Sequence, residues 1–228
     1  MSLKPKKHSD KKKIQEKMQQ KKSRMGTLHK LPPYTMIICE GVKTEPLYLK
    51  GFVNKINEKY KEISRTEHIF VYGIGRNTKG LLEFVDRMAA SGGWDRYERF
   101  WLVYDKDDFP YDNFDNTQFS AEKRKGSKIK VAWSNECIEL WFLLHFQEYV
   151  SNNGREQYIK KLNEYFEYSK SREDLYDVMI RKGSLEDAKR RAKRLLQDFQ
   201  ERGVTSPSAM VPATRVFELI EELEGYIE

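Results

Sequence analysis

The first strong pattern in the chain is a short apolar run at residues 34–39 that contains β-branched residues and ends at a Glu-Gly pair. Such a run is typical of a fully buried β-strand. Apolar residues then recur at helical spacing, on one face of a helix that begins near Pro46; they are Leu49, Phe52, Val53, Ile56 and Tyr60. The pattern therefore predicts a strand, a tight acidic turn and a helix, with Glu40 at the carboxyl end of the strand.

Three further apolar runs, at residues 68–72, 99–104 and 128–133, predict strands in the same part of the chain. A second amphipathic helix follows the first of these runs, and its apolar positions are Leu81, Phe84, Val85 and Met88. Strands that alternate with helices in this way are typical of a parallel sheet covered by helices.

Residues 134–146 are apolar almost all round, which predicts a buried helix, capped by Ser134 or Asn135. Beyond residue 150 the periodicity is helical and predicts no further strand, and one long helix opens at Ser184 and ends at Gly203. We therefore predict an α/β fold. A mainly parallel four-stranded sheet flanked by helices occupies residues 31–150, and a helical C-terminal part, residues 151–228, packs on the same domain.

Positive charge is concentrated at the start of the chain. The net charge is +7, but residues 1–30 carry eleven Lys or Arg against Asp10 and Glu16, which gives +9 there and 7 − 9 = −2 elsewhere. We expect this basic tail to be disordered on its own and to contact phosphates non-specifically, through lysines such as Lys11, Lys12 and Lys13. The alternative is an arm that only improves solubility.

Composition excludes several classes of protein. The two cysteines, Cys39 and Cys137, lie in apolar surroundings without Cys-x-x-Cys spacing, which argues against a zinc site or a disulfide framework. No run of 18 apolar residues exists, and the N-terminus lacks the apolar core of a signal peptide. We expect a cytoplasmic protein that does not interact with a membrane.

Carboxylates follow two of the predicted strands. Glu40 ends the first strand, and Asp105 and Asp107 follow the third. The carboxyl ends of parallel strands form the crevice in which ligands bind, and carboxylates gathered there need a cation to stay ionised. We therefore predict that these three residues bind a hard divalent cation. The alternatives are that Glu40 or Glu45 caps the following helix, and that the aspartates only begin a loop.

Other charged residues stand near the same predicted edge. Glu139 lies in a helix that is otherwise apolar, so it needs a metal, a cation or His145 as its partner. Arg76 follows the glycine-rich turn after the second strand and is a candidate phosphate contact, although Asn77 or Thr78 there is expected only to cap the next helix. Arg215 opens the last helix, where a cation is unfavourable unless something negative pairs with it.

Four segments together resemble the RloB-like family. They are ICEGVKTEPLY with Glu40 and Glu45, YDKDD with Asp105 and Asp107, SNECIELWFLLHF with Glu139, and PATRV. The resemblance covers residues 33–225 and implies a Toprim-like, Rossmann-like fold and an association with bacterial restriction and phage defence. Toprim enzymes hold Mg²⁺ with a Glu after the first strand and an Asp-x-Asp after a later one, which correspond to Glu40, Asp105 and Asp107. The family commonly has proline where this chain has Glu136, so the resemblance assigns a role to Glu139 and none to Glu136.

The expected function is a nuclease, or another phosphodiester-cleaving enzyme, that depends on Mg²⁺ or Mn²⁺ and serves defence. Glu40, Asp105, Asp107 and Glu139 are its expected metal ligands, with Glu40 as an alternative general base. Cationic side chains are expected to offset charge on the phosphate; they are Lys43, Lys106 and Arg215. The expected partners are DNA or RNA, held by Arg76, Lys106 and the tail, and other proteins of the defence system. Two alternatives are a non-catalytic sensor of nucleic acid or a nucleotide, and an inherited scaffold without a metal.

Overall fold

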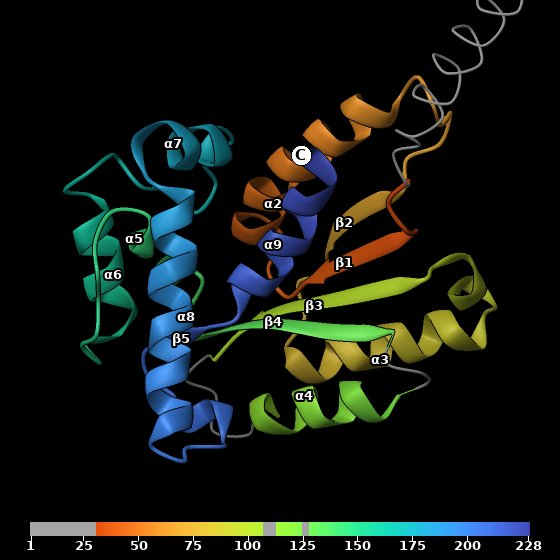
Figure 1. Cartoon of the computed structure of the whole chain (residues 1–228). Coiled ribbons are helices and arrows are strands. Elements are labelled where there is room, and N and C mark those ends of the chain that lie inside the picture. Colours follow the sequence, from red (N-terminus) through yellow and green to blue (C-terminus); the bar gives the residue numbers. More distant parts are fainter. Residues whose placement is uncertain (1–30, 107–112, 125–127) are drawn as a thin grey trace, which may run out of the picture. The chain divides into compact units, whose positions relative to one another are not determined.

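The computed structural model describes residues 31–106, 113–124 and 128–228, and Pro32–Glu228 forms one compact unit. Its sheet has the strand order β2-β1-β3-β4-β5 (Figure 1). The first four strands are parallel, and β5 is antiparallel to β4. The strands are β1 (Thr35–Cys39), β2 (Ile69–Gly73), β3 (Arg99–Asp105), β4 (Ile129–Asn135) and β5 (Ala213–Thr214). The predicted α/β class and mainly parallel sheet are confirmed.

The fifth strand corrects the prediction of four strands with none beyond residue 150. β5 has only two residues, so it is too short to produce a recognisable alternation of apolar and polar positions. It pairs with the end of β4, where Ser134 Oγ lies 2.9 Å from Thr214 Oγ1. Ser134 and Asn135 are therefore strand residues, and neither is the predicted helix cap.

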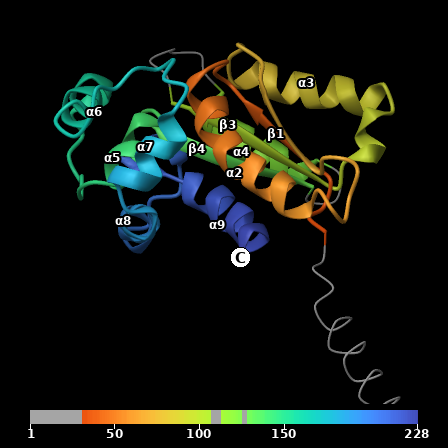
Figure 2. The same cartoon turned by 90° about the horizontal axis from the view of Figure 1, so that it is seen from above.

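Helices cover both faces of the sheet. α2 and α9 lie on one face, and α3 and α4 lie on the other (Figures 1 and 2). The helices α5 to α8 lie beyond the carboxyl ends of the strands (Figure 1). The bounds of the helices are α2 (Thr44–Tyr60), α3 (Thr78–Ala90), α4 (Phe114–Lys123), α5 (Glu139–Leu144), α6 (Gly154–Leu162), α7 (Leu175–Lys182), α8 (Leu185–Glu201) and α9 (Val216–Ile227). In the described ranges, none of these is both long and apolar enough to span a bilayer.

Local signals for the helix starts were partly right. Asn77 caps α3 by accepting a hydrogen bond from the Gly80 backbone, and Ser184 caps α8 in the same way, as predicted. The sequence pattern predicted no helix over the segment that forms α4. Its buried residues, Phe114, Thr117 and Ala121, recur at helical spacing, but polar residues around them hide the pattern.

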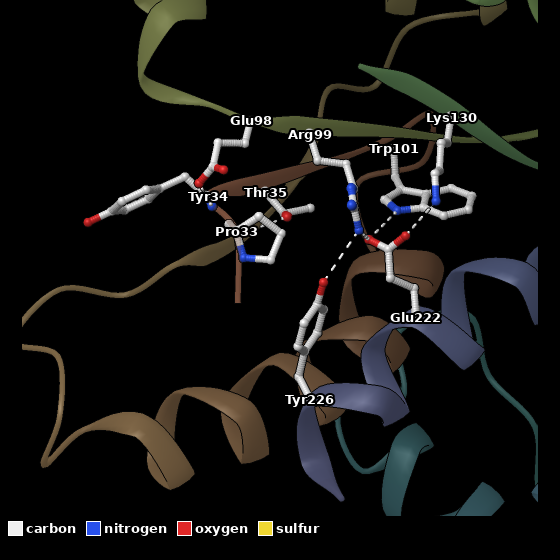
Figure 3. A network of polar contacts seen from close by, with 9 residues as sticks. All are labelled: Pro33, Tyr34, Thr35, Glu98, Arg99, Trp101, Lys130, Glu222 and Tyr226. Carbon is white, nitrogen blue, oxygen red and sulfur yellow. Dashed lines mark hydrogen bonds and ion pairs between the residues drawn. The ribbon is translucent and has the colours of Figure 1, made fainter. Parts of the chain in front are cut away.

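One partly buried acid, Glu222, bonds the last helix to the sheet. Glu222 of α9 accepts hydrogen bonds from Trp101 Nε1 at 3.2 Å and from Lys130 Nζ at 2.7 Å, and it pairs with Arg99 (Figure 3). Burial alone would raise the pKa of Glu222, but these cationic and indole donors outweigh it and lower the pKa. The C-terminal helix is thus bonded to β3 and β4, which packs the end of the chain on the sheet.

A buried aromatic network joins α2 to α5. Trp141 Nε1 donates to the Tyr48 hydroxyl at 3.0 Å, and His145 Nδ1 donates to the Trp141 carbonyl at 3.0 Å. The Tyr48 hydroxyl in turn lies 3.3 Å from His145 Nε2. Burial lowers the pKa of His145 to about 4, so the imidazole is neutral. His145 therefore helps to join α2 to α5, and its hydrogen-bond partners among the described residues do not include Glu139.

Candidate active site

The strand order places a crevice at the carboxyl ends of β1 and β3. From β1 the chain crosses to β2 on one side, whereas from β3 it crosses to β4 on the other, so the strand order reverses between β1 and β3. In open α/β sheets such a reversal is where ligands bind. A pocket of about 290 Å³ lies at this position. Its lining includes four carboxylates, Glu40, Glu45, Asp105 and Glu139, and three cations, Lys43, Arg155 and Lys170.

The first two acids come from adjacent strand ends. The Glu40 backbone N–H donates to the Val103 carbonyl at 2.8 Å, which continues the pairing of β1 with β3 by one residue. The Glu40 carboxylate then accepts a hydrogen bond from the Asp105 backbone N–H, with 3.2 Å between nitrogen and Oε2. The predicted proximity of Glu40 and Asp105 is therefore present in the structure.

The turn after β1 is shaped around Glu45. The Gly41 N–H donates to Glu45 Oε1 at 3.1 Å, and a Cβ on residue 41 would lie only 2.4 Å from Glu45 Oε2. A side chain at residue 41 would therefore displace the carboxylate. Burial raises the pKa of Glu45, and the charge of Glu139 raises it further against hydrogen bonds that lower it. Glu45 lies in the first turn of α2, and it is also one of the residues that line the crevice.

Asp105 is the acid whose surroundings oppose its ionisation most clearly. Its side chain is 15% exposed, and the Ile138 N–H donates to it. Within the described residues, its Oδ1 atom has no hydrogen-bond partner. Burial raises the pKa of Asp105 well above the usual value, and the charges of Glu45 and Glu139 add to the effect. Arg155 Nη2 stands 4.0 Å from the other carboxylate oxygen.

Glu139 is buried at the start of α5, with its side chain 2% exposed. The Tyr168 hydroxyl donates to Glu139 Oε1 at 2.8 Å, and Lys170 Nζ lies 3.8 Å from the same oxygen. Lys170 is held in place because the Thr44 hydroxyl donates to its carbonyl at 3.0 Å. The partner that the sequence required for Glu139 is thus a tyrosine and a lysine, and it is not His145.

The remaining predicted site residues do not all lie in the crevice. Lys43 lines the crevice and Arg76 lines a neighbouring groove. Lys106 lies near enough to Asp115 to lower its pKa and is not among the pocket's lining. Arg215 is also absent from the crevice: its guanidinium forms two 2.8 Å bonds with Glu218 one turn later, so its negative partner is a neighbour in its own helix. Asp107, Lys11, Lys12 and Lys13 lie outside the described residues.

The chemistry of the crevice side chains suits a bound divalent cation. An unpartnered, buried Asp105 oxygen beside two other acids is a position that a divalent ion would neutralise. Over the described ranges, no three His, Cys, Asp or Glu side chains form a ready-made metal group. The identity of the metal ligands therefore stays a prediction, in which Asp107 is included.

Sequence reasoning missed Arg155 and Lys170. Both come from the helical C-terminal part, and neither sits in a pattern that distinguishes it from exposed surface cations. The one local signal was the Asn153-Gly154 pair, which marks a turn at the start of α6. That turn lets the Arg155 N–H donate to Glu136 at 3.1 Å while its side chain extends towards Asp105.

Comparison with known proteins gives one result. Neither the search of curated proteins nor that of solved structures finds a match. The profile of the family described as "RloB-like protein" matches residues 35–223, which include all four carboxylates of the crevice. The match covers most of the chain, and the protein therefore belongs to the RloB-like family.

Proposed function

We propose that this protein is a Mg²⁺- or Mn²⁺-dependent phosphodiesterase that cleaves nucleic acid in the cytoplasm as part of a bacterial defence system, and that its fold is Toprim-like. One observation carries the proposal: four carboxylates and three cations line one crevice where the strand order reverses. Such a crevice offers anionic ligands for a metal and cationic groups for a phosphate.

The chain's own residues divide into two roles. Glu40, Asp105 and Glu139, with Asp107, would hold the metal, and Glu40 would alternatively accept a proton from the attacking water. A bound divalent cation supplies an activated water and stabilises the charge on the leaving oxygen. Lys43, Arg155 and Lys170 line the same crevice and would offset negative charge on the phosphate.

A second candidate function is a non-catalytic sensor that binds a nucleotide or nucleic acid while a partner protein of the same defence system does the chemistry. The observation that favours it is the spacing of the described carboxylates, no three of which form a metal group. Such a crevice would bind a charged ligand through Lys43, Arg155 and Lys170 without hydrolysing it.

Calorimetry with Mn²⁺, followed by cleavage of labelled DNA and RNA in the same preparation, separates the two. The proteins are wild type, Asp105→Asn/Asp107→Asn, and a control, Asp177→Asn/Asp198→Asn, which removes two exposed acids that do not line the crevice. An enzyme loses both metal binding and cleavage in the first variant only. Metal binding without cleavage by wild type favours the sensor, and no metal binding contradicts the proposed mechanism.

A further inference from the structure

A second concave surface lies beside the crevice, between the edge strand β2 and helix α3. This groove has a volume of about 680 Å³, and Tyr72, Arg76, Phe84, Arg87 and Met88 are among its lining residues. β2 is at the edge of the sheet, and Tyr72 is 47% exposed there. The groove therefore presents an aromatic ring and two guanidinium groups to solvent, and its lining includes no acid.

The two arginines of the groove differ from the other clustered cations of the chain. The side chains of Arg76 and Arg87 make no ion pair or hydrogen bond with any residue that the structure describes. The basic face of α8, in contrast, is neutralised within the protein by acids: Lys189 by Glu186 and Glu224, Arg190 by Asp187, Lys193 by Glu221, and Arg194 by Glu148. The charge of the groove is thus available to an external anion.

Neighbouring backbone segments line the groove and the crevice. The Ile74 N–H donates to the Cys39 carbonyl at 3.0 Å, and the Gly75 N–H donates to the Glu40 carbonyl at 3.0 Å. Gly73 and Ile74 line the groove, and Glu40 and Gly41 line the crevice. The segments that line the two hollows are therefore hydrogen-bonded neighbours, so a nucleic-acid strand bound in the crevice has the groove next to it.

We infer that this groove binds a single-stranded segment of nucleic acid next to the phosphate that lies in the crevice; the inference rests on the proposed function. Tyr72 stacks on a base, and Arg76 and Arg87 contact phosphates. An exposed aromatic ring flanked by cations is the usual device for single strands, because their bases are free to stack on it. Bases paired inside a duplex do not offer that face, so the groove selects single strands.

Fluorescence anisotropy of labelled single-stranded DNA and RNA, and of duplexes of the same sequence, tests this with the full chain. EDTA is present, so binding is measured whether or not the protein cleaves. Tyr72→Ala is expected to weaken binding about tenfold, because stacking on an aromatic side chain has an effect of that order. Arg76→Gln/Arg87→Gln is expected to lower the slope of log affinity against log salt by about 1.4, which corresponds to two phosphate contacts on a single strand.

The matched control is Lys79→Gln/Lys182→Gln, which removes two exposed cations outside the groove and is expected to bind as wild type does. Equal binding by wild type and both groove variants would overturn the inference and assign binding to other surfaces. An equal loss of single-strand and duplex binding would overturn the selectivity for single strands. Loss of single-strand binding alone supports the inference even if wild type cleaves nothing, so its failure and that of the proposed function are distinguishable.

Discussion

The carboxylate of Glu40 accepts a hydrogen bond from the backbone N–H of Asp105, at 3.2 Å. This bond ties the acid after β1 to the end of β3, so neither strand can slip without moving the site. The bond uses the backbone of Asp105 and not its side chain, whose Oδ1 has no hydrogen-bond partner among the described residues. The strand ends are therefore held by their own contacts while one carboxylate stays available for a ligand.

Asp105→Asn is expected to raise the melting temperature of the metal-free protein at neutral pH. Burial and the charges of Glu45 and Glu139 raise the pKa of Asp105, so its ionised form costs stability once the pH rises above the unfolded value. The amide removes that charge at similar size. Scanning fluorimetry in EDTA checks the shift, with Asp177→Asn, at an exposed position of α7, as the control whose melting temperature should not change. Mn²⁺ should stabilise wild type and leave Asp105→Asn unchanged.

Gly41→Ala is expected to lower stability by about 1 to 3 kcal/mol and to reduce activity, because its Cβ would collide with the Glu45 carboxylate. The control is Gly225→Ala in α9, where a Cβ would meet no heavy atom within 4 Å. Alanine there should stabilise by about 0.5 to 1 kcal/mol. Urea unfolding measures both variants. Equal stability of Gly41→Ala and wild type would show that Glu45 is not fixed by this turn.

His145 is expected to make folding sensitive to mild acid. Its pKa is lowered to about 4 in the folded protein, while the unfolded chain has the ordinary value of about 6.5. The stabilising contribution is complete above the unfolded pKa and is lost as the pH falls towards the folded one. Between about pH 7.5 and pH 5 the loss is about 2 kcal/mol. Urea unfolding of wild type should show this loss, and His145→Gln should show a smaller pH dependence.

Glu222→Gln is expected to destabilise the protein by about 2 kcal/mol, because Arg99 and Lys130 lose the acid that accepts from them. The lowered pKa of Glu222 means that its stabilising contribution is present above the unfolded value and is lost as the pH falls through the folded one. The neighbour Glu221→Gln is the control. Glu221 pairs with exposed Lys193, so its loss should cost less than about 1 kcal/mol in urea unfolding.

The sequence predicted the parallel strands because all four are mainly apolar runs, and the central β1 and β3 are buried along almost their whole length. It missed β5, whose two residues carry no period, and α4, whose polar residues outnumber its buried ones. It also placed the helix after β4 too early. Ser134 and Asn135 look like caps, but their pairing with β5 extends the strand, and a contact with residues 213–214 is not readable from local pattern.

The acids of the site were predictable, and their counter-charges were not. Glu40 and Asp105 were found because they follow apolar runs, and Glu139 because it interrupts one. Arg155 and Lys170 have no such local mark, since they reach the crevice only through the packing of the C-terminal part. Arg215 was expected there because a cation at the start of a helix needs a negative partner. That partner is Glu218, one turn later in the same helix.

The hydrogen bond from the Thr44 hydroxyl to the Lys170 carbonyl joins α2, the helix after β1, to a residue 126 positions later in the chain. A fragment that ended at residue 150 would retain the four parallel strands and the four carboxylates of the crevice. It would lose Arg155, Lys170, Tyr168 and the edge strand that covers β4. Such a fragment would keep four acids that repel one another and would lose two of the three cations that face them. The complete site therefore needs both the sheet and the C-terminal helices.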